Sequence, residues 1–315
     1  MSSIEVIGLG AINLDYLCQV SEITLDSETT IEHVKATPGG SAANTVYGLA
    51  KLGLSTGFIG AVGDDEEGRL CLLDLQGAGV DTSQIQIKKE EKTGYALCLS
   101  DKQGRRSSYV SPGANSLFDW LDINLDYPNQ GQIIHLSSFV DEKQFDIQIK
   151  LAQKLSHSSK ISFAPGMLYA TKGTKALSPI LKRTSMLFIN REEMERLTEK
   201  NFVAGAKQCL DLGCDIVIIT LGRGLALGDK LFTSYILARS GEYRIGSQKQ
   251  LQGSELETTG AGDAFSAGFL FGFLKGKSLE VCGRLGDIMA HFAMSKAGAR
   301  DGLPSLVQLS QRFEF

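Results

Sequence analysis

The feature that most constrains the fold is a regular alternation of short apolar runs with longer helical patterns. Runs typical of buried strands lie at residues 5–11, 56–62, 133–137, 161–164, 186–189 and 216–220. Helical patterns lie between them, at residues 41–52, 69–76, 144–155, 192–197 and 202–212. This alternation predicts an α/β fold in which a central, mostly parallel sheet is flanked by helices on both faces.

Two regions interrupt the alternation with strand-like segments that read as antiparallel pairs. They lie at residues 17–20 with 29–37, and at residues 93–101 with 107–110. The second pair is joined by Asp-Lys-Gln-Gly at 101–104, which is good turn chemistry. We therefore expect a single domain over residues 1–315 with a small β-sheet lid built from segments at about 14–37 and 93–110.

The expected lid carries apolar side chains that a monomer would leave exposed. They are Val20, Ile23, Ile31, Val34, Leu97 and Leu99, interleaved with the charged residues Glu22, Glu32, Lys35 and Asp101. A projecting sheet with an apolar face is usually covered by closure over a substrate or by a partner. The pattern favours a homodimer formed through the lid.

Composition excludes several classes of function. The net charge of −4 and the absence of a basic run argue against nucleic-acid binding. The longest apolar stretch, residues 264–274, is too short and too glycine-rich to span a membrane. The six cysteines form no CxxC pair, and no signal-peptide pattern opens the sequence. We expect a cytoplasmic protein whose cysteines are small buried apolar residues.

The segment with the strongest chemical signal is Glu-Thr-Thr-Gly-Ala-Gly-Asp-Ala-Phe at 257–265, directly before a glycine-spaced apolar helix. Glycines ahead of a helix let several N–H groups point at one anion, and the helix dipole adds positive potential there. Asp263 in the first helical turn would lie beside a bound phosphate, where a carboxylate can accept the proton of an attacking hydroxyl. From the residues alone, Asp263 could also be a plain helix-start acid after a tight turn.

Two further segments suit a polyhydroxylated ligand. Gly39 and Gly40 precede a helix that Ser41 is expected to cap, and Asn44 follows one turn later. Asn13 and Asp15 share one face of an extended segment after the first strand, where open α/β sheets bind ligands. Each segment has a structural alternative, as an Asx turn or a helix cap.

A dinucleotide-binding fingerprint is a weaker interpretation of the glycines. Gly8 and Gly10 follow a strand, but the third position of the fingerprint is Asn13, and no helical pattern clearly follows. Gly260 and Gly262 likewise lack the third glycine, with Phe265 in its place.

Taken together, the motifs resemble those of the ribokinase-like carbohydrate kinases, the phosphofructokinase-B family. The two signatures are Gly-Gly-Ser-Ala-Ala-Asn at 39–44 and Thr-Thr-Gly-Ala-Gly-Asp-Ala-Phe at 258–265. The resemblance extends to Asn13 and Asp15, Thr-Gly-Tyr-Ala at 93–96, Asn190-x-x-Glu193 and Thr-Leu-Gly-Arg-Gly at 220–224. These motifs lie in the family's order over nearly the whole chain, and jointly they are highly specific.

The resemblance implies a role for each group of residues. Asp263 is similar to the family's catalytic base, and the amides of Gly260, Ala261 and Gly262 resemble its anion hole. Asn190 and Glu193 match the motif that positions Mg²⁺ and phosphates through water, which makes Glu193 the expected metal residue. The expected nucleotide side comprises Thr220, Gly222, Gly224 and Thr259. The expected acceptor pocket comprises Asn13, Asp15, Gly39, Gly40 and Asn44.

The implied reaction is transfer of the γ-phosphoryl group of ATP, with Mg²⁺, to a hydroxyl of a sugar or related small polyol. A nucleoside kinase of the same family is the alternative acceptor class. Outside the class, the alternatives are an NAD-dependent oxidoreductase and a non-catalytic sugar- or nucleotide-binding sensor. Three positions depart from the family pattern: many members have Asp in place of Glu257, and ribokinase has a cation-binding serine in place of Gly302 and a lysine in place of Ser41. These departures put activation by a monovalent cation in doubt and weaken the case for ribose itself.

Overall fold

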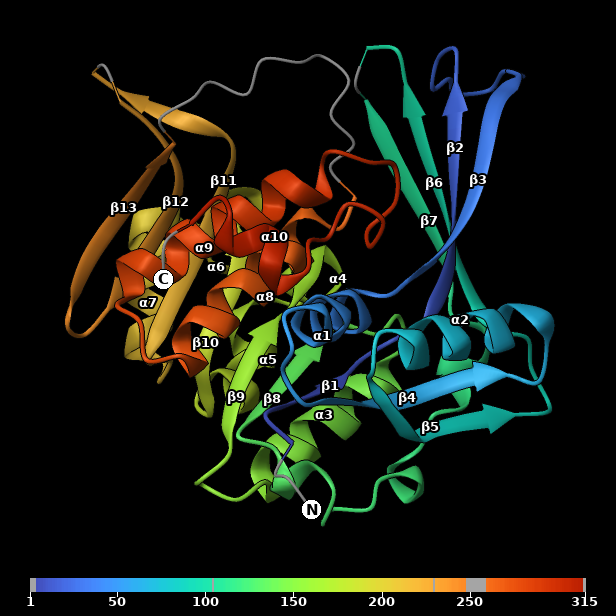
Figure 1. Cartoon of the computed structure of the whole chain (residues 1–315), viewed down its shortest axis with the longest axis horizontal. Helices are drawn as coiled ribbons and strands as arrows, with labels where there is room; N and C mark the ends of the chain where they lie inside the picture. The colour runs from blue at the N-terminus through green and yellow to red at the C-terminus, as the bar shows by residue number, and fades with distance from the viewer. Residues whose placement is uncertain (1–3, 104, 229, 248–258, 314–315) are drawn as a thin grey trace.

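The computed structural model of the chain describes residues 4–103, 105–228, 230–247 and 259–313. A nine-stranded sheet runs through the molecule in the order β13-β12-β11-β10-β9-β8-β1-β4-β5 (Figure 1). Its strands are β1 (Val6–Leu9), β4 (Thr56–Gly63), β5 (Asp81–Lys88), β8 (Ile133–Ser137), β9 (Lys160–Ala164), β10 (Thr184–Asn190), β11 (Ile216–Leu227), β12 (Lys230–Ala238) and β13 (Gly241–Ser247). Neighbours from β11 to β5 pair in parallel, and β12 and β13 are added antiparallel. The predicted mostly parallel sheet is confirmed.

Helices cover both faces of this sheet because its strands are apolar on both sides. In β10, Met186 and Phe188 enter one core cluster, whereas Leu187 and Ile189 enter the other. The first cluster also contains residues of α1 (Ser41–Lys51), α2 (Glu66–Gly77), α8 (Ala261–Leu274) and α9 (Leu279–Ala293). The second contains residues of α3 (Glu142–Lys154), α5 (Gly173–Leu181), α6 (Arg191–Thr198) and α7 (Phe202–Asp211).

A separate four-stranded sheet extends away from the main sheet (Figure 1). Its order is β3 (Ile31–Gly39), β2 (Asn13–Val20), β6 (Gly94–Asp101) and β7 (Arg106–Ser111). The β2–β3 and β6–β7 pairs are antiparallel, as the sequence predicts, and a parallel pairing of β2 with β6 joins them into one sheet. We call these four strands the small sheet.

The remaining elements are short. They are α4 (Gly166–Ala170), α10 (Leu306–Ser310) and the 3₁₀ helices η1 (Gly113–Leu117), η2 (Trp120–Asp122) and η3 (Pro128–Gln130). Within the residues that the structure describes, we find no helix with the length and apolar character needed to cross a membrane.

The edge strands of the main sheet carry no apolar run that would reveal them in the sequence. Strand β5 is largely half-exposed, with Ile85 as its buried side chain, and its residues are mostly polar.

The prediction that Ser41 caps α1 is wrong. Gly40, with φ of 99°, occupies the N-cap position, and Ser41 is the first helical residue, whose hydroxyl is used elsewhere.

Candidate active site

Asp263 occupies the first turn of α8 and is held by two side chains of α1. Gly260 begins this helix with φ of 75°, and a Cβ on Gly260 would lie 2.4 Å from the Cβ of Ala299, so only glycine fits there. Ser41 Oγ donates to Asp263 Oδ1 at 2.6 Å, and Asn44 Nδ2 donates to Oδ2 at 2.8 Å. The two glycine-led helices that the sequence singled out therefore meet at one carboxylate.

The surroundings of Asp263 tune its pKa. Burial raises the pKa from 3.8 to about 6, although the bonds from Ser41 and Asn44 and the charge of Arg300 act in the opposite direction. The carboxylate is therefore mostly ionised at pH 7, yet it is more basic than an ordinary aspartate. That is the state a general base needs.

The amino end of α8 presents backbone amides next to this carboxylate. The first intrahelical bond runs from Ala264 N to Gly260 O at 2.9 Å, so the amides of Ala261 and Gly262 precede the helical ladder. Thr259 lies in the turn directly before Gly260. A Cβ built on Gly262 meets no atom within 4 Å, so this backbone faces open space. The arrangement fits the predicted anion hole.

That open space is a cavity of about 330 Å³. It is lined by Ser41, Ser138, Ala164, Gly166, Phe188, Ile189, Asn190, Glu193, Thr220, Gly262, Asp263, Phe265 and Ser266. The carboxyl ends of β9 and β10, the neighbouring Thr220 of β11 and the amino end of α8 thus converge on one pocket, as is typical of ligand sites in open α/β sheets.

Asn190 and Glu193 reach this cavity as a reciprocal cap of α6. Asn190 Oδ1 accepts from Glu193 N at 2.8 Å, and Glu193 Oε2 accepts from Asn190 N at 3.0 Å. Burial, with a smaller contribution from Asp263, raises the pKa of Glu193. An added positive charge here would relieve the buried carboxylates. The carboxylate and amide oxygens are also a donor set that suits Mg²⁺.

Three of the four predicted nucleotide-side residues lie at a distortion of β11, and the fourth, Thr259, precedes α8. The pairing of β11 with β12 loses register between Thr220 and Leu225, where Gly222 and Gly224 have φ of 60° and 92°. Thr220 pairs with Asn190 of β10 and lines the same cavity. The loop expected from the sequence is therefore a glycine-built bulge next to Asn190.

The predicted acceptor residues meet where the small sheet joins the rest of the chain. Asn13 and Gly39 are paired neighbours in β2 and β3. A Cβ on Gly39 would lie 2.1 Å from Asp15 Oδ2, so glycine is required for this carboxylate to sit against the strand. Position 40 also requires glycine, because a Cβ there would lie 2.2 Å from the carbonyl oxygen of Ala11.

Asp15 is a buried carboxyl with unusual electrostatics. It is 7% exposed, and burial raises its pKa to about 7, opposed by Arg300 and reinforced by the charge of Asp263. Asn13 is 8% exposed, and its Oδ1 accepts from Asn115 Nδ2 at 3.0 Å. Asn115 also donates to Ile12 O at 3.0 Å, so it fixes the start of β2.

The structure adds partners that sequence reasoning missed. Ser41 was expected as a cap but bonds the Asp263 carboxylate, and Asn115 and Asp74 carried no motif at all. Arg300 lay in a segment considered only for cation binding. Its position two residues after Lys-Ala-Gly at 296–298 gave no sign that it is buried.

Two predicted positions bear on a monovalent cation. Glu257 and the neighbouring Thr258 lie outside the described residues. At Gly302, a Cβ would lie 2.2 Å from the carbonyl oxygen of Phe292 and 2.8 Å from that of Ala293. A serine could not replace Gly302 without displacing this backbone.

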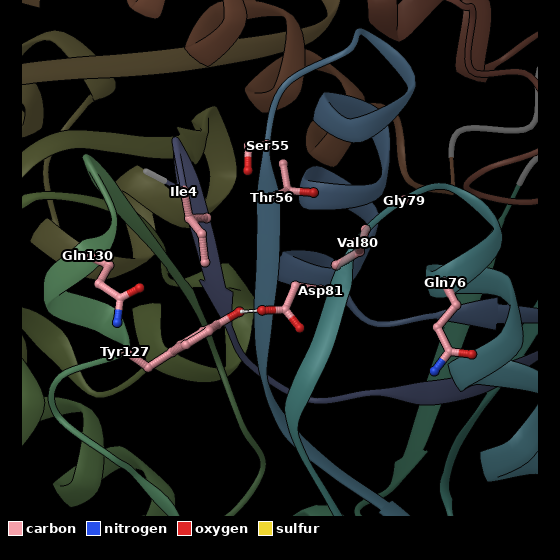
Figure 2. A pocket seen from close by; sticks show the side chains of 9 residues that line it. All are labelled: Ile4, Ser55, Thr56, Gln76, Gly79, Val80, Asp81, Tyr127 and Gln130. Carbon is pink, nitrogen blue, oxygen red and sulfur yellow. Dashed lines mark hydrogen bonds between the residues drawn. The ribbon is translucent and has the colours of Figure 1, made fainter. Parts of the chain in front are cut away.

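A larger cavity, of about 580 Å³, is lined by Ile4, Ser55, Thr56, Gln76, Gly79, Val80, Asp81, Tyr127 and Gln130 (Figure 2). It lies beside the amino ends of β4 and β5, where the hydroxyl of Tyr127 donates to Asp81 Oδ2 at 2.7 Å. None of the predicted site residues lines this cavity.

The fold and the site define a class, an α/β phosphotransferase with an alcohol as acceptor. A sequence model of the pfkB family carbohydrate kinases matches residues 1–306, and the chain belongs to this family. It is an ATP-dependent kinase acting on sugars or nucleosides. The predicted kinase activity is thereby confirmed. The dinucleotide fingerprint fails, since β1 leads into β2 rather than into a helix.

Individual relatives agree with this assignment. The chain is 37% identical to an uncharacterised sugar kinase of Archaeoglobus fulgidus, over 82% of this chain and 99% of that one. It is 28% identical to a nucleoside kinase of Methanocaldococcus jannaschii, over 100% and 97% of the two chains. A crystal structure of a nucleoside kinase of that organism has a TM-score of 0.81 at 26% identity, with 99% of each chain covered. The adenosine kinase of Sinorhizobium meliloti, at 22% identity and a TM-score of 0.84 over 99% of each chain, shows the same fold.

Proposed function

We propose that Asp263 is the catalytic base and that the enzyme phosphorylates an uncharged, hydroxyl-rich acceptor held by Asn13 and Asp15. The observation that supports this most directly is the placement of the Asp263 carboxylate. It is bonded to Ser41 and Asn44 of α1 and lines the cavity at the amino end of α8.

The residues suggest the following step. The acceptor hydroxyl donates a hydrogen bond to Asp263, which takes the proton as the acceptor oxygen bonds to the γ-phosphorus. The bond from the γ-phosphorus to the oxygen of the leaving ADP breaks, and the electron pair stays on ADP. The amides of Ala261 and Gly262, at the positive end of the α8 dipole, stabilise the transferred oxygens.

Asn190 and Glu193 would hold Mg²⁺ through water, together with the phosphates at Thr220. When bound, Mg²⁺ supplies positive charge that offsets the phosphate oxygens. The bulge at Gly222 and Gly224 supports the nucleotide side by letting backbone approach the ligand closely.

The charges favour a neutral acceptor. Among the described residues, the acceptor side presents the carboxylates Asp15 and Asp263, which would repel a sugar phosphate or a sugar acid. The guanidinium of Arg300 is already bonded to Asn44, Asp74 and Gly39. A hydroxyl-rich neutral molecule can donate to Asp15 without this repulsion. Sugars and nucleosides both meet this requirement, in keeping with the names of the two relatives.

We also propose that the small sheet is a lid that closes over the acceptor and excludes water, which would otherwise consume ATP by hydrolysis. Ile31 and Val34 of β3 are 46% and 59% exposed, and Tyr95 and Tyr109 of β6 and β7 are 47% and 57% exposed. This apolar surface favours pairing of two subunits through the lid. The cysteine pattern, which contains no CxxC pair, favours a cytoplasmic location.

The test is an ADP-release assay over neutral sugars, nucleosides, sugar phosphates and sugar acids, repeated with Asp263→Asn. We expect turnover with neutral acceptors, and a loss of about 10²–10⁴-fold in kcat for Asp263→Asn with ATP affinity little changed. Asp81→Asn, at the amino end of β5 and outside the site cavity, is the matched control. A preference for phosphorylated acceptors would refute the neutral class, and an Asp263→Asn enzyme with near-normal kcat would refute the base.

A further inference from the structure

Arg300 is a buried cation bonded to residues of three elements around the site. Its residue is 3% exposed, and its guanidinium lies 5.1 Å from the ring centroid of Tyr47. Nε donates to Asn44 Oδ1 at 2.9 Å, Nη2 donates to the Gly39 carbonyl at 3.0 Å, and Nη1 pairs with Asp74 Oδ2 at 2.5 Å. One rigid fork therefore touches α1, β3 and α2 at once.

The bond to Asn44 decides which way its amide points. An arginine N–H can only donate, so it must face the amide oxygen of Asn44. The amide nitrogen is then directed at Asp263 Oδ2, to which it donates at 2.8 Å. If the amide rotated by half a turn, its oxygen would face the carboxylate, and the two acceptors would repel each other.

The bond to Gly39 acts on the acceptor side. Gly39 lies against the carboxylate of Asp15, with space for no side chain between them. By bonding to the Gly39 carbonyl, Arg300 fixes the end of β3, against which the Asp15 side chain of β2 packs. The base and the acceptor carboxylate are thus tied to one guanidinium.

We propose that Arg300 is a positioning residue that acts through Asn44 to hold the Asp263 carboxylate in the orientation that accepts the acceptor proton. The inference rests on the proposed role of Asp263 as the base. Electrostatics agree with the geometry, because the charge of Arg300 lowers the pKa of both Asp263 and Asp15.

The test is a double-mutant cycle of Arg300→Met and Asn44→Ala. We expect Arg300→Met to lower kcat by about 10–100-fold at saturating substrates, as removal of a hydrogen bond to a charged group does. Since Arg300 acts through Asn44, the double variant should be no slower than Asn44→Ala. The KM for ATP should stay unchanged. Arg183→Met, which removes an arginine bonded to the carbonyls of Ala152 and Leu155, should keep wild-type kcat.

A pH profile separates positioning from a merely structural role. The charge of Arg300 lowers the pKa of Asp263, and the charge of Asp263 in turn raises the pKa of Asp15 and of Glu193. Loss of the cation should move the acid limb of kcat in Arg300→Met to higher pH, whereas Arg183→Met should leave it in place. Arg300→Lys keeps the positive charge but lacks the planar guanidinium. Its acid limb should therefore lie at the wild-type pH, whereas its kcat should stay low.

The outcomes are distinguishable. Multiplicative effects of Arg300→Met and Asn44→Ala, or an unchanged kcat in Arg300→Met, would overturn the inference while Asp263→Asn remains inactive. Near-normal turnover of Asp263→Asn would overturn the proposed function itself. If melting curves show that Arg300→Met does not fold, the cycle is run with Arg300→Lys, for which the same non-additivity is expected.

Discussion

Replacing Asp15 with asparagine should stabilise the enzyme without substrate at alkaline pH while weakening acceptor binding. Asp15 is buried to 7% exposure, and its pKa is about 7 in the folded chain against 3.8 for an ordinary aspartate. The folded state therefore prefers the protonated carboxyl. Its contribution to stability is complete below the unfolded pKa and is lost as the pH rises through about 7.

The size of this effect follows from the two pKa values. Because the unfolded chain ionises Asp15 more readily than the folded one, the free energy of unfolding is lowered by about 1.7 kcal/mol at pH 5 and by about 4.3 kcal/mol at pH 8, so about 2.6 kcal/mol is lost between them. For a chain of this length, that corresponds to a melting temperature about 4 °C lower at pH 8. The asparagine cannot ionise, so the variant should lack this loss.

The assay is chemical denaturation of wild type and Asp15→Asn at pH 5 and pH 8, without substrate. Other buried acids titrate in both proteins, so the quantity of interest is the difference between their pH dependences. Asp126→Asn removes an exposed carboxylate and should keep the wild-type dependence. In kinetics, Asp15→Asn should raise the acceptor KM by about 10-fold, because a neutral amide replaces a charged hydrogen-bond acceptor.

The pH dependence of the acceptor KM tests the same reasoning. A hydroxyl donor favours ionised Asp15, so the wild-type acceptor KM should fall as pH rises through about 7. Equal losses of stability in wild type and Asp15→Asn between pH 5 and pH 8 would refute the argument. So would equal rises in the KM values for acceptor and ATP, which would make Asp15 a structural residue.

Two further predictions concern the cation and the lid. Activity should respond only weakly to potassium, because Glu257 replaces a usual aspartate and Gly302 has no room for a ligating side chain. The test is to measure rates in sodium-free buffer with magnesium, before and after potassium is added. A many-fold rise on adding potassium would contradict the prediction. The wild-type protein should sediment as a dimer, and the double variant Ile31→Glu, Val34→Glu should sediment as a monomer, since both side chains are exposed on β3. A wild-type protein that is monomeric at assay concentration would refute the dimer but not the role of the small sheet as a lid.

Much of the fold could be predicted from the sequence because local residue patterns determine strands, helices and turns. Apolar runs on both faces of β10 predict a buried parallel strand, and the glycines ahead of Asp263 predict a turn into a helix. Strand β5 was missed for the same reason, since its residues are mostly polar and half-exposed at an edge.

The site is different, because its decisive contacts join positions far apart in the chain. Arg300 and Asn44 are separated by 256 positions, and Ser41 and Asp263 by 222. Periodicity and turn chemistry operate over a few residues and carry no information about such pairs. The sequence by itself determined the order of the motifs along the chain, the two helices preceded by glycines, and the carboxylate at the start of the second helix. Only the tertiary structure decided that the hydroxyl of Ser41 bonds to Asp263 instead of capping its own helix, and that Arg300 is buried against Asn44 and the Gly39 carbonyl. Burial and distance, which set the pKa values near 6 and 7, exist only once the chain is folded.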